Sequence, residues 1–245
     1  MAQTRKPLTL LFAGFGFTPK HIAAHAKLYR GLGGTTIDIN LSVLDLTRPS
    51  GGPKHGTAIV DRLREADPTG TRPLTAHVIS GSYWMFLYTL LAMTPEERSR
   101  FVGLFFDSTP PTSGVDAFGG WAAFALGRPQ WKPYLSPLFH GYRAAVGITP
   151  TWEKEAAGWA LGPEACVPRH VPVTYLRCKD DPVVCPEHHQ RAVLDTFQNS
   201  DPGVPVRSVT LTGRHALGIK DSPTAYCAAF MDYYNDLHHL LPLEE

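Results

Sequence analysis

Residues 77–83 of the chain read His-Val-Ile-Ser-Gly-Ser-Tyr, a heptapeptide in which an apolar strand gives way to a helical pattern. The strand pattern ends at Ser80, and the helical pattern begins two residues later. A serine at such a turn projects its hydroxyl above the sheet, and the backbone N–H that follows it can face an oxyanion. The full motif is G-x-S-x-G, whereas Val78 and Ser82 hold the outer positions here. Gly81 and the small Ser82 still permit the tight turn. The alternative is a serine that only caps the helix.

The rest of the chain alternates short apolar runs with stretches of helical length. The apolar runs cover 8–13, 36–46, 74–79, 101–107, 172–178 and 206–212, and the helical stretches cover 19–31, 53–66, 82–93, 186–198 and 222–239. Short, nearly continuous apolar strands are typical of a parallel sheet that is buried on both faces. The alternation therefore predicts the α/β class, with a mostly parallel sheet and helices on both faces.

The length of 245 residues suits one domain of this class, so we expect a single domain over 1–245. Residues 110–169 break the alternation and contain four of the five tryptophans. A long insertion between sheet strands usually packs over the carboxyl ends of the strands, where ligands bind. We therefore expect 110–169 to form a helical cap insertion in which Trp121 and Trp131 contact a bulky, largely apolar small-molecule substrate. The alternative is a helical excursion that only covers the core.

Composition excludes several function classes. Lys plus Arg number 23 and Asp plus Glu number 22, so no basic excess points to nucleic acid as a partner. The longest apolar run, 83–93, is far shorter than the ~20 residues that span a bilayer. The apolar stretch 8–13 is short for a signal peptide and lacks a cleavage site, which predicts a cytoplasmic protein without a transmembrane span. The sequence leaves the oligomeric state open, a homo-oligomer included.

The four cysteines form no C-x-x-C pair and are too sparse for a disulfide scaffold, so we expect reduced thiols. A zinc site at Cys185, His188 and His189 is disfavoured because adjacent histidines on a helix point in different directions. We expect neither a metal nor a cofactor.

An acidic loop leaves the apolar run at 172–178. Asp181 stands directly before Pro182, which restricts its backbone to extended geometry, and it is the preferred carboxylate, with Asp180 as the alternative. An Asp-Pro pair taken alone is also ordinary turn chemistry.

His215 follows the apolar run at 206–212. A single loop histidine is often only a solvated residue, but the order along the chain adds information. Ser80, Asp181 and His215 each stand just beyond a strand, in the Ser…Asp…His order of α/β-hydrolases. This order predicts a catalytic triad with His215 as the base.

The first apolar run ends in Gly14-Phe15-Gly16-Phe17. Neither phosphate-binding glycine motif is present, which disfavours a nucleotide-binding loop. The glycines let the backbone turn under a ligand, so we expect the N–H groups of Phe15 and Gly81 to form an oxyanion hole. Gly14, Gly16, Phe17 and Tyr83 are the expected substrate contacts beside it.

Over nearly its whole length the chain resembles one family. This is the α/β-hydrolase-like family of the so-called transmembrane protein 53 and of the fungal PaxU-type proteins of secondary-metabolite clusters. The shared motifs are Phe12-Ala-Gly-Phe-Gly-Phe-Thr-Pro-Lys-His21, Leu28-Tyr29, His77-Val-Ile-Ser80, Phe106-Asp-Ser-Thr-Pro110, Asp181-Pro-Val-Val184, His215, Pro223 and Tyr226. Ser82 and Tyr83 replace the family's elbow glycines, and Gly218 stands where relatives often carry a second histidine. These departures bear on the reaction more than on the fold.

Three functions remain open. The first is a serine hydrolase or acyl-transfer enzyme acting on a bulky apolar ester, thioester or secondary metabolite. The second is a cyclase, lyase or isomerase that uses the same pocket without an acyl-enzyme. The third is a non-catalytic interaction protein with a hydrolase-like fold.

Overall fold

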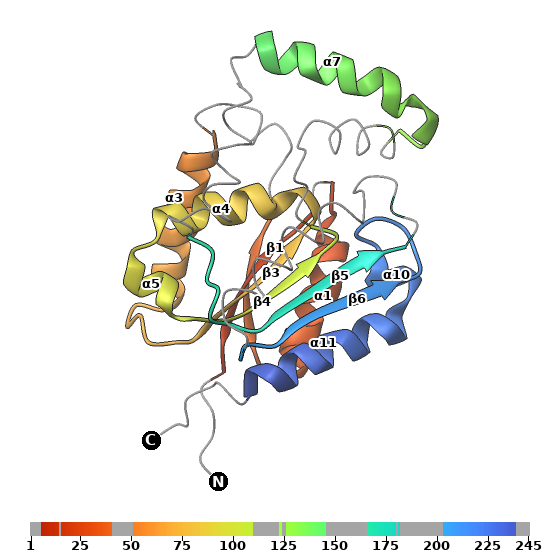
Figure 1. Ribbon diagram of the computed structural model, residues 1–245. Coiled ribbons are helices and arrows are strands. Elements are labelled where there is room, and N and C mark those ends of the chain that lie inside the picture. The colour runs from red at the N-terminus through yellow and green to blue at the C-terminus, as the bar shows by residue number, and fades with distance from the viewer. Residues whose placement is uncertain are drawn as a thin grey trace.

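The computed structural model describes residues 6–14, 16–40, 51–109, 123, 126–145, 166–179, 181 and 203–238. In this part of the chain six strands form one sheet in the order β2-β1-β3-β4-β5-β6, and all neighbouring strands are parallel (Figure 1). The strands are β1 (Leu8–Phe12), β2 (Thr35–Ile39), β3 (Leu74–Ile79), β4 (Phe101–Asp107), β5 (Val173–Cys178) and β6 (Val206–Leu211). The parallel sheet predicted from the apolar runs is confirmed.

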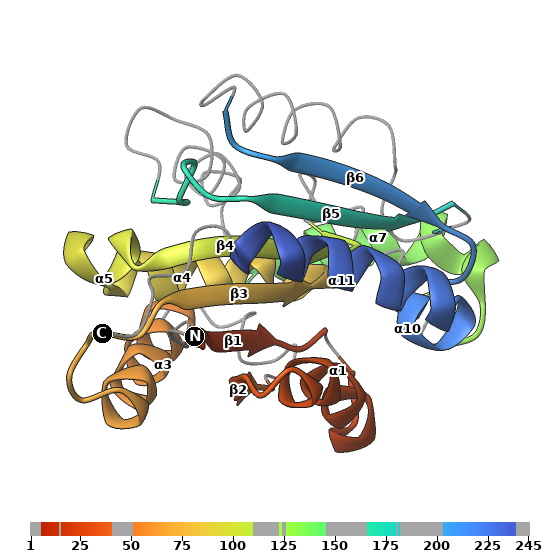
Figure 2. The same ribbon diagram turned by 90° about the horizontal axis from the view of Figure 1, so that it is seen from below.

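Helices cover both faces of this sheet (Figure 2). Helices α3 (Gly51–Ala66) and α4 (Tyr83–Ala92) pack on one face, and α1 (Pro19–Gly31) and α11 (Pro223–His238) pack on the other. The shorter helices are η1 (Ser80–Ser82), α5 (Pro95–Ser99), η2 (Pro129–Trp131) and α10 (Gly218–Asp221), and α7 (Lys132–Ala145) follows η2. The predicted arrangement of helices on both faces is confirmed.

Side-chain alternation along the central strands explains the two cores. Successive side chains of a strand point to opposite faces. In β4, Leu104 and Phe106 pack under α3 and α4, whereas Phe105 packs under α1 and α11. Helix α4 is apolar around almost its whole circumference because it packs against both the sheet and the neighbouring helix α3. Gly56 permits that approach, since a Cβ there would meet the carbonyl oxygen of Tyr88 at 2.4 Å.

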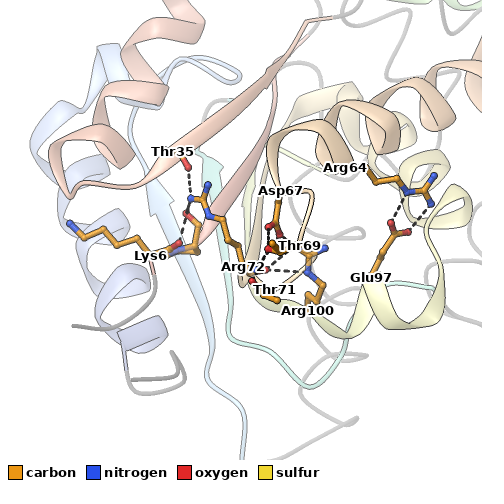
Figure 3. A network of polar contacts seen from close by, with 10 residues as sticks. Lys6, Thr35, Arg64, Asp67, Thr69, Thr71, Arg72, Glu97 and Arg100 are labelled. Atoms are coloured by element: carbon orange, nitrogen blue, oxygen red, sulfur yellow. Dashed lines mark hydrogen bonds and ion pairs between the residues drawn. The ribbon is translucent and has the colours of Figure 1, made fainter. Parts of the chain in front are cut away.

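A polar network joins the amino ends of the strands (Figure 3). Asp67, only 5% exposed, accepts hydrogen bonds from the Arg100 guanidinium, from the Arg72 backbone N–H at 3.1 Å and from the Thr69 hydroxyl at 3.0 Å. The Arg72 guanidinium reaches the hydroxyl of Thr35 at the start of β2, at 2.5 Å. Burial raises the pKa of Asp67, but these hydrogen bonds and the Arg100 charge more than offset it, so the net pKa is lowered.

Several expected boundaries shift. The strand expected at 36–46 begins at Thr35 and ends at Ile39, and residues 41–50 lie outside the described residues. The helix expected at 186–198 and most of the cap at 110–169 also lie outside them. Helix α7 lies within the segment expected to form the cap, and in Figure 1 it stands beyond the carboxyl ends of the strands. The cap itself remains a prediction. No helix in the described part of the chain has the length and apolar character that crossing a membrane would require.

Candidate active site

Ser80 stands where β3 passes into η1 and α4. Its φ of 54° lies in the left-handed region, which a non-glycine residue adopts only under strain, whereas Ile79 before it is extended. This abrupt change in backbone direction lifts the Ser80 side chain out of the sheet at its carboxyl edge. The strand-to-helix turn predicted from residues 77–83 is therefore present without the outer glycines of the motif.

Ser82 explains how the turn forms without them. Its hydroxyl lies 2.7 Å from the carbonyl oxygen of Ile79 and 3.0 Å from that of Phe12, and it accepts a hydrogen bond from the Ile79 N–H at 3.2 Å. The side chain therefore ties the turn to the end of β1. From the sequence, Ser82 was expected only to be small enough for the turn, and its hydrogen bonds to Ile79 and Phe12 were missed.

The three residues predicted to form a triad lie together. Ser80 Oγ is 2.5 Å from His215 Nε2, and His215 Nδ1 is 2.6 Å from Asp181 Oδ2. All three lie at the carboxyl edge of the sheet: Ser80 follows β3, Asp181 follows β5 and His215 follows β6. The side chains of His215 and Asp181 are only 4% and 3% exposed, so water screens their interaction weakly.

The backbone around His215 is held on both sides. Arg214 forms a two-pronged ion pair with Asp221 of α10, with contacts at 2.9 and 2.8 Å, and this pair lowers the pKa of Asp221 to about 2. On the other side, Ala216 has a φ of 53°, and its N–H donates to the Ser108 hydroxyl at 3.1 Å. Ser108 itself has a φ of 53°. The His215 loop is therefore fixed by specific contacts to α10 and to the end of β4.

The residues predicted for the oxyanion hole and the glycines predicted for substrate contact come from the turn after β3 and from the loop after β1. Gly81 follows Ser80 in η1, whereas Phe15 lies outside the described residues. A Cβ on Gly14 would meet the Phe17 ring at 3.1 Å and Ile79 at 3.3 Å, so the loop after β1 lies against the end of β3. Gly16 has a φ of +79°, which allows the loop to turn.

Besides Phe17, three aromatic residues were predicted to contact the substrate. Tyr83 is buried, and its ring packs against Trp84, Phe86 and Phe106 within the core. Trp131 at the end of η2 is 46% exposed. Trp121 lies outside the described residues. No described contact joins Tyr83 or Trp131 to Ser80, and their binding roles remain predictions.

A buried polar cluster beneath the site was missed by sequence analysis. The Tyr226 hydroxyl lies 2.9 Å from Asp107 Oδ2, 3.2 Å from His25 Nδ1 and 3.2 Å from His77 Nε2. The Tyr29 hydroxyl adds a contact of 3.1 Å to His77 Nδ1. We call these five residues the buried hub. A usable signal was present, because His77 interrupts an apolar strand and His25 and Tyr29 are spaced i, i+4 on one helix.

Burial dominates the protonation of the hub. It lowers the pKa of His25 to about 3 and that of His77 well below its ordinary value, so both imidazoles are neutral. Burial also raises the pKa of Asp107 to about 6, although hydrogen bonds from Tyr226 and Ser108 act in the opposite direction. At neutral pH the hub therefore holds one carboxylate and two neutral histidines.

The ligand atoms of His25, His77 and Asp107 lie within 4.8 Å of one another, which is a spacing that a metal ion could use. The Tyr226 hydroxyl, however, is within hydrogen-bond distance of all three and occupies the space that an ion would need. The cluster fits a hydrogen-bonded network better than a metal centre. The disfavoured zinc site at Cys185, His188 and His189 lies outside the described residues.

Comparisons with known proteins agree with the sheet and its topology. No protein-family model matches the chain, and no curated protein sequence matches it. Among solved structures, a thermostable carboxyl esterase from Bacillus coagulans superposes with a TM-score of 0.60 at 13% identity, covering 96% of this chain and 91% of that one. An esterase from Pyrococcus furiosus gives 0.58 at 11% identity, with 95% and 81% covered. The chain has the α/β-hydrolase fold.

A third structure with this fold is an acetyl ester-xyloside bifunctional hydrolase from Caldicellulosiruptor lactoaceticus, with a TM-score of 0.57 at 15% identity and coverage of 97% and 85%. These identities are low, so the likeness concerns the α/β-hydrolase fold and not a shared substrate. The narrower resemblance to transmembrane protein 53 and the PaxU-type proteins remains a prediction. Ser80 stands at the strand-to-helix turn after β3, Asp181 follows β5, and His215 follows β6, with β4 between β3 and β5 in the sheet.

Proposed function

We propose that the protein is a serine-dependent hydrolase or acyl-transfer enzyme that acts on a bulky, largely apolar ester or thioester. The observation that carries this proposal is the contact of 2.5 Å between Ser80 Oγ and His215 Nε2, with Asp181 behind His215 at 2.6 Å. A nucleophile, a base and a group that orients the base are then connected by direct hydrogen bonds. Three solved structures of the same fold described as esterases or an acetyl ester hydrolase add support.

In the first half-reaction, Ser80 Oγ attacks the carbonyl carbon while its proton passes to His215 Nε2. Asp181 accepts a hydrogen bond from Nδ1–H, holds the imidazole in the required tautomer and stabilises the imidazolium that forms. The tetrahedral oxyanion is bound by the backbone N–H of Gly81 and, as we propose, by that of Phe15. His215 then returns the proton to the leaving alcohol or thiol, and an acyl-Ser80 ester remains.

In the second half-reaction, water or an acceptor alcohol takes the place of the leaving group. His215 removes its proton as it attacks the acyl-Ser80 carbonyl, and the proton passes back to Ser80 Oγ when the acyl bond breaks. Water gives a carboxylic acid, and an acceptor alcohol gives a new ester. We propose that the segment 110–169, with Trp121 and Trp131, forms the apolar side of the substrate pocket.

Labelling with a fluorophosphonate probe tests the proposal, because only an activated serine hydroxyl attacks phosphorus at a useful rate. We expect the wild-type protein to be labelled, Ser80→Ala to be unlabelled and His215→Gln to be labelled about 10³-fold more slowly or worse. The matched control is Ser99→Ala on α5, which removes a serine hydroxyl outside the triad that donates to the backbone carbonyl oxygen of Glu96. This variant should be labelled like the wild type. Labelling that survives Ser80→Ala would overturn the proposal.

The same experiment separates the alternatives. Turnover of an apolar metabolite that survives Ser80→Ala would favour a cyclase, lyase or isomerase in the same pocket. Absence of both labelling and turnover in the folded wild-type protein would favour a non-catalytic interaction protein.

A further inference from the structure

The direction of every hydrogen bond in the buried hub follows from one group. The ionised Asp107 can only accept, so the Tyr226 hydroxyl donates its single proton to Oδ2 at 2.9 Å. The Tyr226 oxygen must then accept from His25 Nδ1–H and His77 Nε2–H, each at 3.2 Å. His77 Nδ1 is left as an acceptor for the Tyr29 hydroxyl. The hub is therefore an ordered network whose direction is set by Asp107.

The network continues from Asp107 to the loop that carries His215. The Ser108 hydroxyl donates to Asp107 Oδ1 at 3.0 Å and accepts from the Ala216 N–H at 3.1 Å. Ala216 directly follows His215, whose Nε2 meets Ser80 at 2.5 Å. An unbroken series of hydrogen bonds therefore joins Tyr226 on α11 to the main chain beside His215.

Backbone strain coincides with this connection. Ser108 and Ala216 both have a φ of 53°. Non-glycine residues persist in that region only when the surrounding contacts over-determine it, and such strain concentrates at functional sites. Here the two strained residues bond to each other through Ser108 Oγ and the Ala216 N–H. Strain at both ends of this bond therefore favours a functional role for the connection.

The hub also lies beneath the other loops of the site. His77 precedes Ser80 by three residues on β3, and His25 stacks on Phe17 of the loop after β1, with ring centroids 5.8 Å apart. Asp107 ends β4, and Tyr226 lies in α11 beyond the His215 loop. Four segments that are distant in sequence thus meet at one buried hydroxyl.

We propose that Asp107, Ser108 and Tyr226 are positioning residues for His215. They hold the loop at Ala216 so that His215 Nε2 meets Ser80 while Nδ1 meets Asp181. This inference rests on the proposed function, because it assigns these residues to the base of that reaction. It predicts that breaking the series changes the chemical step more than substrate binding, since none of the three is proposed to touch the substrate.

Tyr226→Phe tests the inference, because it removes one hydroxyl and keeps the ring. The matched control is Tyr233→Phe on the same helix, a buried tyrosine whose hydroxyl faces Gly103 of β4 rather than the hub. We expect kcat for an apolar ester to fall about 10- to 100-fold in Tyr226→Phe with KM changed less than about threefold. Tyr233→Phe should keep kcat within about twofold. Equal kcat in the two variants, or a change confined to KM, would overturn the inference.

Ser108→Ala is the second variant, in case Tyr226→Phe does not fold. Alanine at the same φ has the same backbone strain as serine and lacks only the hydroxyl. We therefore expect kcat to fall again by about tenfold or more. The double variant should lose little more than the larger single loss, because both changes break one series. Full additivity would mean that the residues act separately and would contradict the proposal.

A readout that does not depend on activity separates this inference from the proposed function. The ring proton of His215 in the 2.6 Å contact with Asp181 should resonate at low field in the proton NMR spectrum, and His215→Gln identifies it by its loss. We expect Tyr226→Phe and Ser108→Ala to shift or broaden this signal, and Tyr233→Phe to leave it unchanged. An unchanged signal in all three variants would refute the positioning role, whatever the outcome of the Ser80→Ala labelling.

Discussion

The carboxylate of Asp181 and the imidazole of His215 are joined at 2.6 Å, and neither side chain is more than 4% exposed. A carboxylate in this position fixes which imidazole nitrogen carries the proton, and it leaves Nε2 free to accept the proton of Ser80. The backbone N–H of Asp181 donates to the carbonyl oxygen of Cys178 at 3.3 Å, which holds the carboxylate close to the end of β5.

Replacing Asp181 by asparagine should therefore lower kcat by about 10³-fold or more, because the amide favours the wrong imidazole tautomer. Asp180→Asn is the control for the neighbouring carboxylate and should cost less than about tenfold. Steady-state kinetics on an apolar ester, with folding checked by circular dichroism, measures both. Equal losses in the two variants would mean that the wrong member of the pair had been chosen.

The neutral histidines of the hub predict how stability depends on pH. The pKa of His25 is lowered from 6.5 to about 3, and that of His77 is also strongly lowered. Between pH 6.5 and about 3 the unfolded chain therefore binds protons that the folded chain does not, so the free energy of unfolding falls as the pH drops through this window. Asp107 acts in the opposite direction, because its pKa is raised from 3.8 to about 6 and the folded chain takes up that proton first.

Two histidines oppose one carboxylate, so the expected net result is a loss of stability on acidification below about pH 6. Urea unfolding across that range measures the slope. His25→Gln keeps a donor for Tyr226 and removes one of the two histidines, so its slope should be shallower than that of the wild type. An unchanged slope would show that His25 is protonated in the folded protein.

The ion pairs at the amino ends of the strands should differ in their contribution to stability. Asp67→Asn removes the charge that Arg100 contacts at a largely buried position and should lower the free energy of unfolding by about 2 kcal/mol. Glu97→Gln alters a pair whose partner, Arg64, is half exposed, and should cost less than about 1 kcal/mol. Denaturant titration of both variants, with kcat measured alongside, should show a stability loss for Asp67→Asn and no change in kcat for either.

Trp131 should matter for bulky substrates and not for small ones. Its exposed ring offers apolar surface to a ligand at roughly 25 cal/mol per Å², so Trp131→Ala should raise KM for a long-chain ester about tenfold and leave acetate esters unaffected. We expect the same of Trp121→Ala. Met231→Ala, which removes a partly exposed apolar side chain from α11, is the control. Equal effects on the KM values of long and short esters would show that Trp131 does not line the substrate pocket.

The sheet was predictable from the sequence because its central strands β1, β3, β4 and β5 are short apolar runs, and burial on both faces leaves that signal in each of them separately. The meeting of Ser80, Asp181 and His215 was predictable because each follows a strand, in the order along the chain that is typical of the α/β-hydrolase fold. Helix α5 was missed although Thr94 and Glu97 form a capping box, with Thr94 accepting from the Glu97 N–H at 3.2 Å. A five-residue helix gives too few turns for hydrophobic periodicity to register.

The buried hub could not be predicted in the same way. Its members lie at positions 25, 29, 77, 107 and 226, and each acquires its partners only when the sheet and two helices assemble. In the sequence, a polar residue within an apolar run looks like an isolated exception to the hydrophobic pattern of its own segment. Only the tertiary structure shows that several such exceptions satisfy one another's hydrogen bonds.

Within the described ranges, three non-glycine residues have a positive φ, and these residues, Ser80, Ser108 and Ala216, all stand at the carboxyl edge of the sheet. Each such conformation costs on the order of 1 kcal/mol, and glycine at the same position would relieve the cost. Glycine at 108 would also lose the two buried hydrogen bonds of the Ser108 hydroxyl, so selection of this protein for heat resistance alone would enrich glycine at 216. The resulting variants would survive higher temperatures with a looser His215 loop, so thermostability screens on this scaffold need turnover as a second criterion from the first round.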